Sequence, residues 1–388
     1  MTEAGSRSPI GDSTFTIVWN GAPDSPPASG VRDYLLAQEA RRVTTAIHPL
    51  NPEDDPVRRI TVYERGRPVR ERTVRLPARP PATYAFDPFV PVWPEHVDCW
   101  LGFNNLAAAR GLAQRVVGRA EKVVYWAVDF IPNRFGDGLL TRVYDRLDAM
   151  CCRRVDLRVE VSQAALEGRN ERHDLGGEAA PSAVAPIGAW VDRTPAAPDD
   201  AWKRKRVIFL GHLVPRQGVG RLVEAFRLLA ARGVEFEGEI AGRGPLEDEL
   251  RSSVAEGGLD GRVRFVGFLS DHRDVEAFVA AGSVAVAPYD TEVESFTRYA
   301  DPSKLRSYTA AGLPIVLTDV PPNAHELAAE AGAEVVPFTV EGLAAGIERA
   351  LASPEEWHRR RRQALEYSQR FSWEVIVPRT LKHVGFGP

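Results

Sequence analysis

The sequence predicts an α/β protein built from two Rossmann-like β/α/β domains that face a central cleft. Short apolar runs alternate with amphipathic segments along most of the chain, and this order is typical of parallel sheets covered by helices. Several runs, such as Val284–Pro288, lack polar alternation, as expected of strands buried on both faces. The length of 388 residues also favours about two domains.

The first domain is expected at residues 14–192, after an N-terminal stretch, residues 1–13, that is expected to be disordered. Its first strand ends in a loop rich in glycine, proline and serine, residues 20–30. Loops at the carboxyl ends of parallel strands line the ligand crevice of such sheets. Ser29 and Gly30 are therefore candidate ligand-binding residues, although a plain connecting loop explains the same pattern equally well.

Later strands of this domain also end in polar residues. Asn104 follows a strand predicted at 97–103, and Asp129 follows one predicted at 122–128. A carboxylate at this position can orient a hydroxyl group or accept its proton. The alternative is a structural role, in which Asp129 caps a helix or forms an ion pair with Arg134.

The second domain is expected at residues 206–365. Residues 193–205 are rich in proline, alanine and aspartate and are interpreted as the linker, and residues 366–388 are predicted to form a helix that returns to the first domain. The domain opens with a strand at 206–210 and a polar loop at 211–218. The strand, loop and helix order then repeats, which predicts a second parallel sheet.

The stretch 289–318 predicts a phosphate-binding corner. It joins two buried strands through a long polar loop and a short helix, for which Asp301 is the expected N-cap and Pro302 the first helical residue. Free N–H groups and the helix dipole favour an anion at a helix N-terminus. Lys304 adds a positive charge in the first turn, although the same residue can also be an ordinary surface lysine.

Composition excludes several classes of function. The formal net charge of −4 gives no reason to expect nucleic acid as a partner. Three cysteines, two of them adjacent, form neither a disulfide framework nor a zinc motif, so a reducing cytoplasm is expected. The first residues are polar and lack an apolar core, so no signal peptide is expected, and no apolar run is long enough to predict a membrane-spanning helix. Peripheral membrane contact stays compatible with the sequence. The acidic run at 53–55 lacks a nearby histidine and is interpreted as a solvated patch, and no metal site is expected.

Five segments, in order, resemble the GT-B fold glycosyltransferases, and specifically the retaining glycosyltransferase family 4. The resemblance covers the second half of the chain and is weaker in the first. The segments are GHLVPRQGVGRLVEAF (211–226), AGRGPLEDEL (241–250), VRFVGFLSD (263–271), ADPSKLRSYTAAGLPIVLTD (300–319) and RFSWEVI (370–376).

The resemblance implies a glycosyltransferase that moves a sugar from a nucleotide-diphosphate donor to a hydroxyl acceptor, with retention and without metal or other cofactor. The acceptor is expected to be a small molecule or a glycan, and the Pro-rich segment 77–94 is expected to shape its pocket. The implied catalytic residues are Asp129, Lys304 and Arg216. The implied acceptor-binding residues are Ser29, Gly30, Asn104 and Arg134. The implied donor-binding residues are Gly211, His212, Gln217, Gly242, Gly244, Phe268, Leu269, Glu294, Pro302, Ser303 and Ser307.

Three positions depart from the family pattern. His212 and Gln217 stand where the family carries an arginine and a lysine that hold the donor diphosphate, and Ser307 stands where a ribose-binding glutamate is usual. Two alternatives therefore stay open. One is an inverting GT-B transferase with Asp129 as the general base, and the other is a homologue that binds a sugar nucleotide without catalysis.

Overall fold

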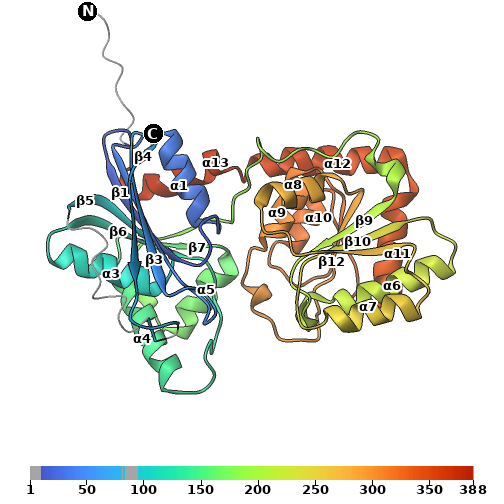
Figure 1. The fold of residues 1–388 in the computed structure, drawn as a ribbon, viewed down its shortest axis with the longest axis horizontal. Helices are drawn as coiled ribbons and strands as arrows, with labels where there is room; N and C mark the ends of the chain where they lie inside the picture. The colour runs from blue at the N-terminus through green and yellow to red at the C-terminus, as the bar shows by residue number, and fades with distance from the viewer. Residues whose placement is uncertain (1–9, 81, 84–94, 388) are drawn as a thin grey trace, which may run out of the picture. The chain divides into compact units, whose positions relative to one another are not determined.

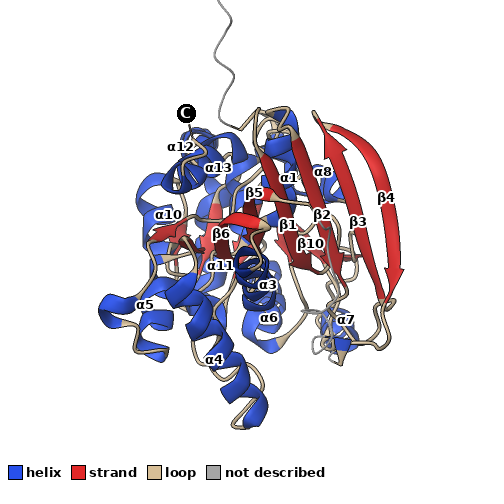
Figure 2. Cartoon of the chain, turned by 90° about the vertical axis from the view of Figure 1, so that its left-hand side faces the viewer, coloured by secondary structure: helices blue, strands red, loops and turns tan. Residues whose placement is uncertain are grey.

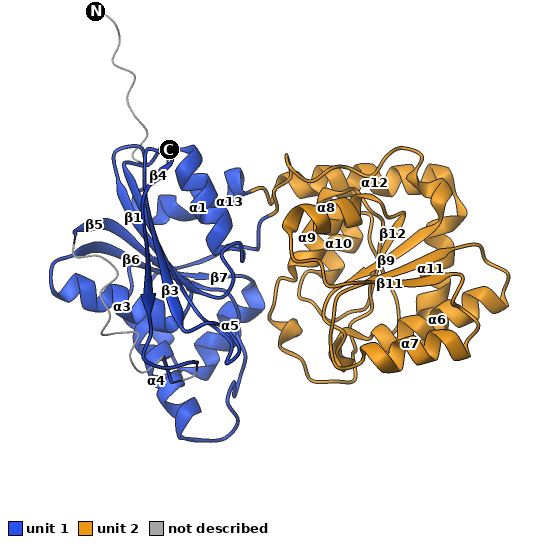
Figure 3. Cartoon of the chain, in the orientation of Figure 1, with its two compact units in different colours: residues 1–188, 373–388 blue, residues 189–372 orange. Residues whose placement is uncertain are grey.

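The computed structural model describes residues 10–80, 82, 83 and 95–387. Contacts divide the chain into an N-terminal unit, residues 1–188 together with 373–388, and a C-terminal unit, residues 189–372 (Figure 3). Both units contain a sheet covered by helices, which confirms the predicted α/β class. Residues 193–205, predicted as a linker, belong to the C-terminal unit and include the 3₁₀ helix Ala201–Arg204.

The N-terminal unit contains an eight-stranded sheet with the order β4-β3-β2-β1-β5-β6-β7-β8 (Figure 1). β3 pairs antiparallel with both of its neighbours, and the other pairs are parallel. The strands are β1 (Thr14–Asn20), β2 (Arg42–His48), β3 (Val57–Glu64), β4 (Arg67–Arg75), β5 (Val97–Gly102), β6 (Ala120–Ala127), β7 (Leu157–Glu160) and β8 (Ser182–Val184). The helices are α1 (Ala28–Ala37), α3 (Asn105–Val116), α4 (Leu139–Arg154), α5 (Gln163–Arg172) and α13 (Trp373–Leu381).

Two parts of this unit depart from a simple α/β pattern. The hairpin of β3 and β4 extends one side of the sheet, and β4 forms its exposed edge (Figure 2). Four arginines and a glutamate lie along β4, and charged side chains protect an open edge against pairing with another strand. The residues from Ile10 to Ser13, which were expected to be disordered, form a turn with Ile10 buried. Most of the Pro-rich segment 77–94 lies outside the described residues.

The C-terminal unit contains a six-stranded sheet that is parallel throughout, with the order β11-β10-β9-β12-β13-β14. Its strands are β9 (Arg206–Leu210), β10 (Glu237–Ala241), β11 (Val263–Gly267), β12 (Val284–Ala287), β13 (Ile315–Leu317) and β14 (Glu334–Val335). Its helices are α6 (Val219–Ala231), α7 (Glu247–Glu256), α8 (His272–Ala280), α9 (Ser303–Ala310), α10 (Ala324–Glu330), α11 (Val340–Ala352) and α12 (Pro354–Gln369).

Hydrophobic burial explains why these residues form these elements. Every residue of β12 and β13 is fully buried, as predicted from the absence of polar alternation. On α6, the apolar residues recur at helical spacing, and all of them lie in the core beneath the sheet: Val219, Leu222, Val223, Phe226 and Leu229.

The C-terminal helix α13 is fixed to the N-terminal unit by a tryptophan that packs on two glycines. A Cβ atom on Gly30 would lie 2.1 Å from the Trp373 ring, and one on Gly188 would lie 2.6 Å from it. The Trp373 side chain is 1% exposed. These two glycines therefore leave the space that the indole ring fills.

We predict that Gly30→Ala destabilises the protein by about 1–3 kcal/mol, because the added methyl group overpacks the contact with Trp373. Chemical denaturation followed by tryptophan fluorescence measures the change. Gly220→Ala is the matched control, since Gly220 also lies in a helix but a Cβ there would meet nothing within 4 Å. A loss of stability that is equal in both variants would contradict the packing argument.

Candidate functional site

The strand order of the C-terminal unit reverses between β9 and β12. The chain runs from β9 to β10 and β11 on one side, and then returns to place β12, β13 and β14 on the other. Ligands of open parallel sheets bind at the carboxyl ends of the strands beside such a reversal. The loop after β9 begins at Gly211, and the loop after β12 begins at Pro288, so these two loops define the candidate site.

Glycines allow the strand-end loops to pack closely. Gly218 has φ of +65°, and a Cβ there would lie 1.7 Å from the carbonyl oxygen of Pro288. Gly242 has φ of +140°, and a Cβ there would lie 1.8 Å from the carbonyl oxygen of Gly211. A side chain on Gly244 would likewise meet the backbone of Leu213, at 2.4 Å. The glycines at 242 and 244 therefore shape the loop after β9 by packing against its backbone.

Lys304 lies at the centre of this arrangement, in the first turn of α9. It is 8% exposed, and its Nζ donates a hydrogen bond of 2.6 Å to Oε1 of Gln217. The same nitrogen lies 4.6 Å from the ring centroid of Phe209 and 4.5 Å from that of Tyr289. No carboxylate in the described part of the chain forms an ion pair with it. Burial lowers the pKa of Lys304 from 10.5 to about 7.

The helix that carries Lys304 begins one residue later than predicted. Pro302 is the N-cap, Ser303 is the first helical residue, and no side chain caps the helix. Asp301 instead accepts hydrogen bonds of 2.8 and 3.1 Å from the Arg306 guanidinium and one of 3.0 Å from Asn323. The prediction of Asp301 as N-cap is wrong, because a buried arginine competes successfully for its carboxylate. The first backbone N–H groups of α9 are left without that cap.

Arg216 approaches the site from the loop after β9. Its guanidinium lies 5.1 Å from the ring centroid of Phe296, and its backbone oxygen accepts a 3.1 Å hydrogen bond from the N–H of Asp290. These contacts join the loops after β9 and β12. Within the described residues, no carboxylate pairs with this guanidinium, so its charge is available to an anion.

The other predicted donor residues surround this centre less closely. His212, Ser303 and Glu294 are exposed, and the Ser307 hydroxyl donates to the Ser303 carbonyl at 3.3 Å. At the end of β11, Phe268 is 55% exposed and carries the Arg243 guanidinium 4.3 Å above its ring, while Leu269 is half-buried. The structure thus brings Lys304, Gln217 and Gly211 together and leaves Glu294 outside that group.

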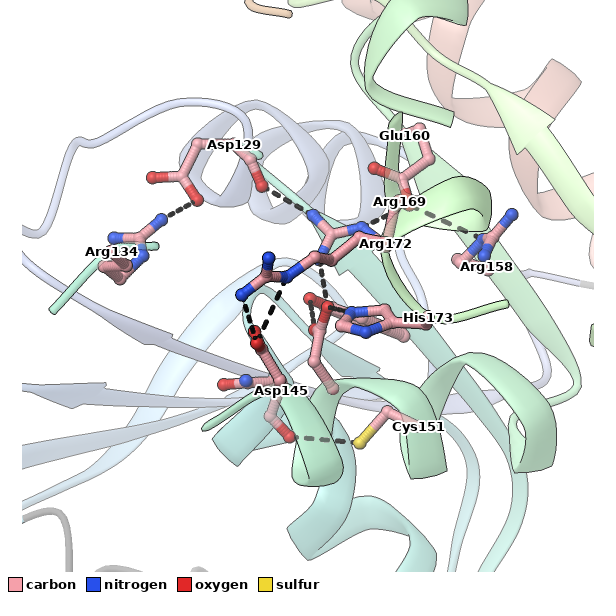
Figure 4. Close-up of polar contacts among 12 residues, drawn as sticks. Asp129, Arg134, Asp145, Cys151, Arg158, Glu160, Arg169, Arg172 and His173 are labelled. Atoms are coloured by element: carbon pink, nitrogen blue, oxygen red, sulfur yellow. Dashed lines mark hydrogen bonds and ion pairs between the residues drawn. The ribbon is translucent and has the colours of Figure 1, made fainter. Parts of the chain in front are cut away.

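In the N-terminal unit, Asp129 and Arg134 form an ion pair (Figure 4). The structural alternative for Asp129 is therefore realised, and two residues predicted for catalysis and acceptor binding lie side by side. The Arg134 guanidinium also lies 5.6 Å from the ring centroid of Tyr144 on α4. Both charged side chains are only partly buried, so the pair stays accessible to a ligand.

A buried network holds the backbone of Asp129 in place (Figure 4). Arg169 donates a 2.6 Å hydrogen bond to the Asp129 carbonyl and a 2.8 Å bond to Glu160, and it also pairs with Asp148. Burial alone would raise the pKa of Asp148, but Arg169, His173 and Tyr125 together lower it to about 2. The carboxylate of Asp148 is thus ionised at neutral pH and keeps Arg169 fixed.

The remaining predicted acceptor residues have structural contacts. Ser29 and Gly30 lie in the first turn of α1 and not in the preceding loop, and the Ser29 hydroxyl donates to the Asp24 carbonyl at 3.1 Å. The prediction of their loop position is wrong because α1 starts at Ala28, earlier than the apolar pattern indicated. Asn104 caps α3 and donates a 2.7 Å hydrogen bond to Asn20.

Sequence reasoning missed the aromatic walls and one amide. Phe209 and Tyr289 flank Lys304, and Asn20 ends β1 beside Asn104. β1 and β5 are the strands between which the order of the N-terminal sheet reverses. Because ligands bind at such strand ends, this rule would have indicated Asn20 and Tyr289 as candidate ligand-binding residues. The sequence around Phe209 indicates only an ordinary core residue.

The described residues contain neither a metal-binding cluster nor a membrane-spanning helix. In residues 10–80, 82, 83 and 95–387, no three histidine, cysteine or acidic side chains are grouped as a metal site would need. Over the same residues, every helix is too short or too polar to cross a membrane.

Residues 204–353 match the family model described as Glycosyl transferases group 1. The C-terminal unit is therefore similar to the domain that this family model describes. The glycosyltransferase AmsK of amylovoran biosynthesis in Erwinia amylovora is 29% identical over 114 residues, or 29% of this chain. That match spans only 28% of the relative's own length, so the likeness is one of domain and not of whole protein.

Solved structures extend the likeness to the fold of the whole chain. Sucrose-phosphate synthase of Thermosynechococcus elongatus has a TM-score of 0.70 at 17% identity, over 95% of this chain and 98% of that one. The Anabaena protein Alr3699/HepE, solved in complex with UDP-glucose, has a TM-score of 0.68 at 15% identity, over 96% and 99%. The matched domain therefore belongs to a chain of GT-B fold, as the resemblance predicted.

We predict that Lys304→Met stabilises the protein by about 1–4 kcal/mol near pH 6.5, because a buried charge is replaced by a side chain of similar volume. The folded-state pKa lies below the ordinary lysine value, so the unfolded chain binds more protons between about pH 7 and pH 10.5. Wild-type stability should rise with pH across that window, and the advantage of the variant should shrink. Urea denaturation at both ends of the window tests this, and a difference that does not vary with pH would contradict it.

Proposed function

We propose that the chain is a glycosyltransferase that moves a sugar from a nucleotide-diphosphate donor to a hydroxyl acceptor. One observation carries this proposal: Lys304 and Gly211 meet at the strand reversal of a domain that matches Glycosyl transferases group 1. A lysine that pairs with no carboxylate of the described residues, next to the glycine backbone at position 211, suits the diphosphate of a donor. The UDP-glucose held by the fold relative HepE is consistent with a donor of this class.

We propose that the reaction proceeds with retention at the anomeric carbon. The acceptor oxygen forms a bond to that carbon as the bond from the carbon to the phosphate oxygen breaks. The leaving diphosphate oxygen takes the acceptor proton, so no strong protein base is needed. Lys304, Arg216 and the uncapped N–H groups of α9 stabilise the negative charge that develops on the diphosphate.

Three further residues receive roles in this proposal. Phe268 offers an exposed aromatic face for the donor base, next to the guanidinium of Arg243. Asp129 of the N-terminal unit orients the acceptor hydroxyl, and its ion pair with Arg134 holds that carboxylate in place. The acceptor is a small molecule or a glycan, and the chemistry requires no metal ion because cations and backbone dipoles neutralise the diphosphate.

The inverting alternative gives Asp129 a different task, that of the general base. The partly exposed carboxylate at a strand end favours this alternative, whereas its ion pair with Arg134 opposes it because the guanidinium already occupies one carboxylate oxygen. NMR of the product decides between the two, because retention and inversion give opposite anomeric configurations from the same donor. An absence of transfer with every sugar nucleotide that binds would instead support a non-catalytic binding protein.

A thermal-shift screen with UDP, GDP, ADP and dTDP and their common sugars identifies the donor. A ligand at about 100 times its Kd should stabilise the protein by about 2.7 kcal/mol. Stabilisation by one nucleotide series is the expected result. No shift with any of them would overturn the proposed function.

We predict that Lys304→Ala lowers kcat by about 10²–10³-fold, since a cation that stabilises the leaving diphosphate is lost. Asp129→Asn should lower it less than about tenfold under the retaining mechanism, because the amide still accepts a hydrogen bond from the acceptor hydroxyl. Steady-state transfer assays with the identified donor measure both. Near-normal turnover in Lys304→Ala would remove Lys304 from the mechanism, and a loss above about 10³-fold in Asp129→Asn would favour a base.

A further inference from the structure

The environment of Lys304 is suited to an uncharged amine and to an ammonium alike. Among the described residues, its Nζ donates to one acceptor, the amide oxygen of Gln217, at 2.6 Å. The faces of Phe209 and Tyr289 cover it at 4.6 and 4.5 Å from their centroids. An amide oxygen and two ring faces attract an ammonium but do not neutralise its charge as a carboxylate would.

Gly211 leaves a small open space at the same point. A Cβ on this residue would lie 3.4 Å from both Lys304 Nζ and Gln217 Oε1. A side chain here would block the approach of another group to that nitrogen. The glycine thus leaves one direction free from which an oxygen of a ligand can reach Nζ at hydrogen-bonding distance.

We propose that Gln217 and Gly211 make diphosphate binding proton-linked, so that Lys304 takes up one proton from solvent as the donor diphosphate binds. This inference rests on the proposed function, because it concerns the same diphosphate site. In the free protein the amine holds two protons and donates one to Gln217. On binding it becomes an ammonium that keeps this bond and donates a new one to a phosphate oxygen.

The direction of the linkage follows from burial. Without a ligand, burial lowers the pKa of Lys304 to about 7, so the amine is largely neutral above that pH. A bound diphosphate raises the pKa again, because its negative charge favours the ammonium. The affinity for diphosphate should therefore fall as the pH rises above about 7, by up to tenfold per pH unit.

Other titratable groups near Lys304 do not explain such an effect. Burial raises the pKa of both Tyr289 and Tyr308, which stay neutral. Asp301 is paired with Arg306, and the exposed His212 is the subject of a control below. The other titratable or charged side chains of β9, of the loops after β9 and β12, and of α9 are Arg206, Arg216, Asp290, Glu292, Glu294, Arg298 and Tyr299.

Gln217 is a positioning residue in this proposal and sets the charge of its neighbour. A carboxylate at the same 2.6 Å would hold Lys304 as a permanent ammonium. The amide directs the nitrogen toward Gly211 without fixing its charge. Gln217→Glu therefore changes the protonation of Lys304 while it preserves the shape of the side chain.

Isothermal titration with UDP, GDP, ADP and dTDP, in buffers of different ionisation enthalpy, tests the proposal. At about pH 7.5 to 8.5 the terminal phosphate of these nucleotides is already ionised, since its pKa is about 6, so proton uptake reports on the protein. Wild type should take up close to one proton at about pH 8.5 and lose about five- to tenfold in affinity across this range. Uptake that stays near zero would overturn the inference while leaving the proposed function in place.

Matched variants separate positioning from mere packing. Gln217→Glu should abolish proton uptake and keep the affinity within about twofold over the same pH range. Gln217→Met should weaken binding at every pH yet retain the uptake. His212→Asn and the exposed Lys203→Met should also retain it. Unchanged uptake in Gln217→Glu would overturn the inference, and an absence of binding by all four nucleotides would overturn both this and the proposed function.

Discussion

The burial of one lysine organises the candidate site of the C-terminal unit. The rings of Phe209 and Tyr289 cover Lys304, and Gln217 accepts a hydrogen bond from it. Phe209 lies near the end of β9, and Tyr289 follows the end of β12. A charged ammonium is costly at this buried position, where none of the described carboxylates pairs with it, and loss of a proton relieves that cost in the free protein. A negatively charged ligand would also offset the cost, so a destabilising feature of the unit is also one that favours an anionic ligand.

The N-terminal unit differs in that buried arginine and carboxylate side chains pair with one another. Its buried charges are paired, because Arg169 contacts Asp148, Glu160 and the backbone of Asp129. Such a network gives little net stability but fixes the position of each member. Asp129 thus presents its carboxylate from a rigid backbone while its side chain stays partly exposed and paired with Arg134. A fixed carboxylate in one unit and an unpaired cation in the other match the different needs of a hydroxyl acceptor and a diphosphate donor.

The sequence predicted the fold well because periodicity reports burial directly. The apolar runs that became β12 and β13, and the stripe of α6, needed no tertiary information. The errors arose where side chains contact residues that are distant in the sequence. Asp301 was expected to cap α9 but pairs with Arg306, and Gly30 was expected in a ligand loop but makes room for Trp373 from the far end of the chain. Rules based on local propensity cannot predict such long-range contacts.

The same limit explains why the altered motif could be noticed but not interpreted from sequence. Gln217 is far from Lys304 along the chain, and only the folded structure shows that its amide oxygen contacts the Lys304 nitrogen. In the proposed diphosphate site, a glutamine in place of a cation removes one charge, and it also relieves repulsion on the lysine that remains. The loss of attraction for a diphosphate is thus partly offset, because Lys304 can stay neutral until the ligand arrives and become charged when the charge is useful.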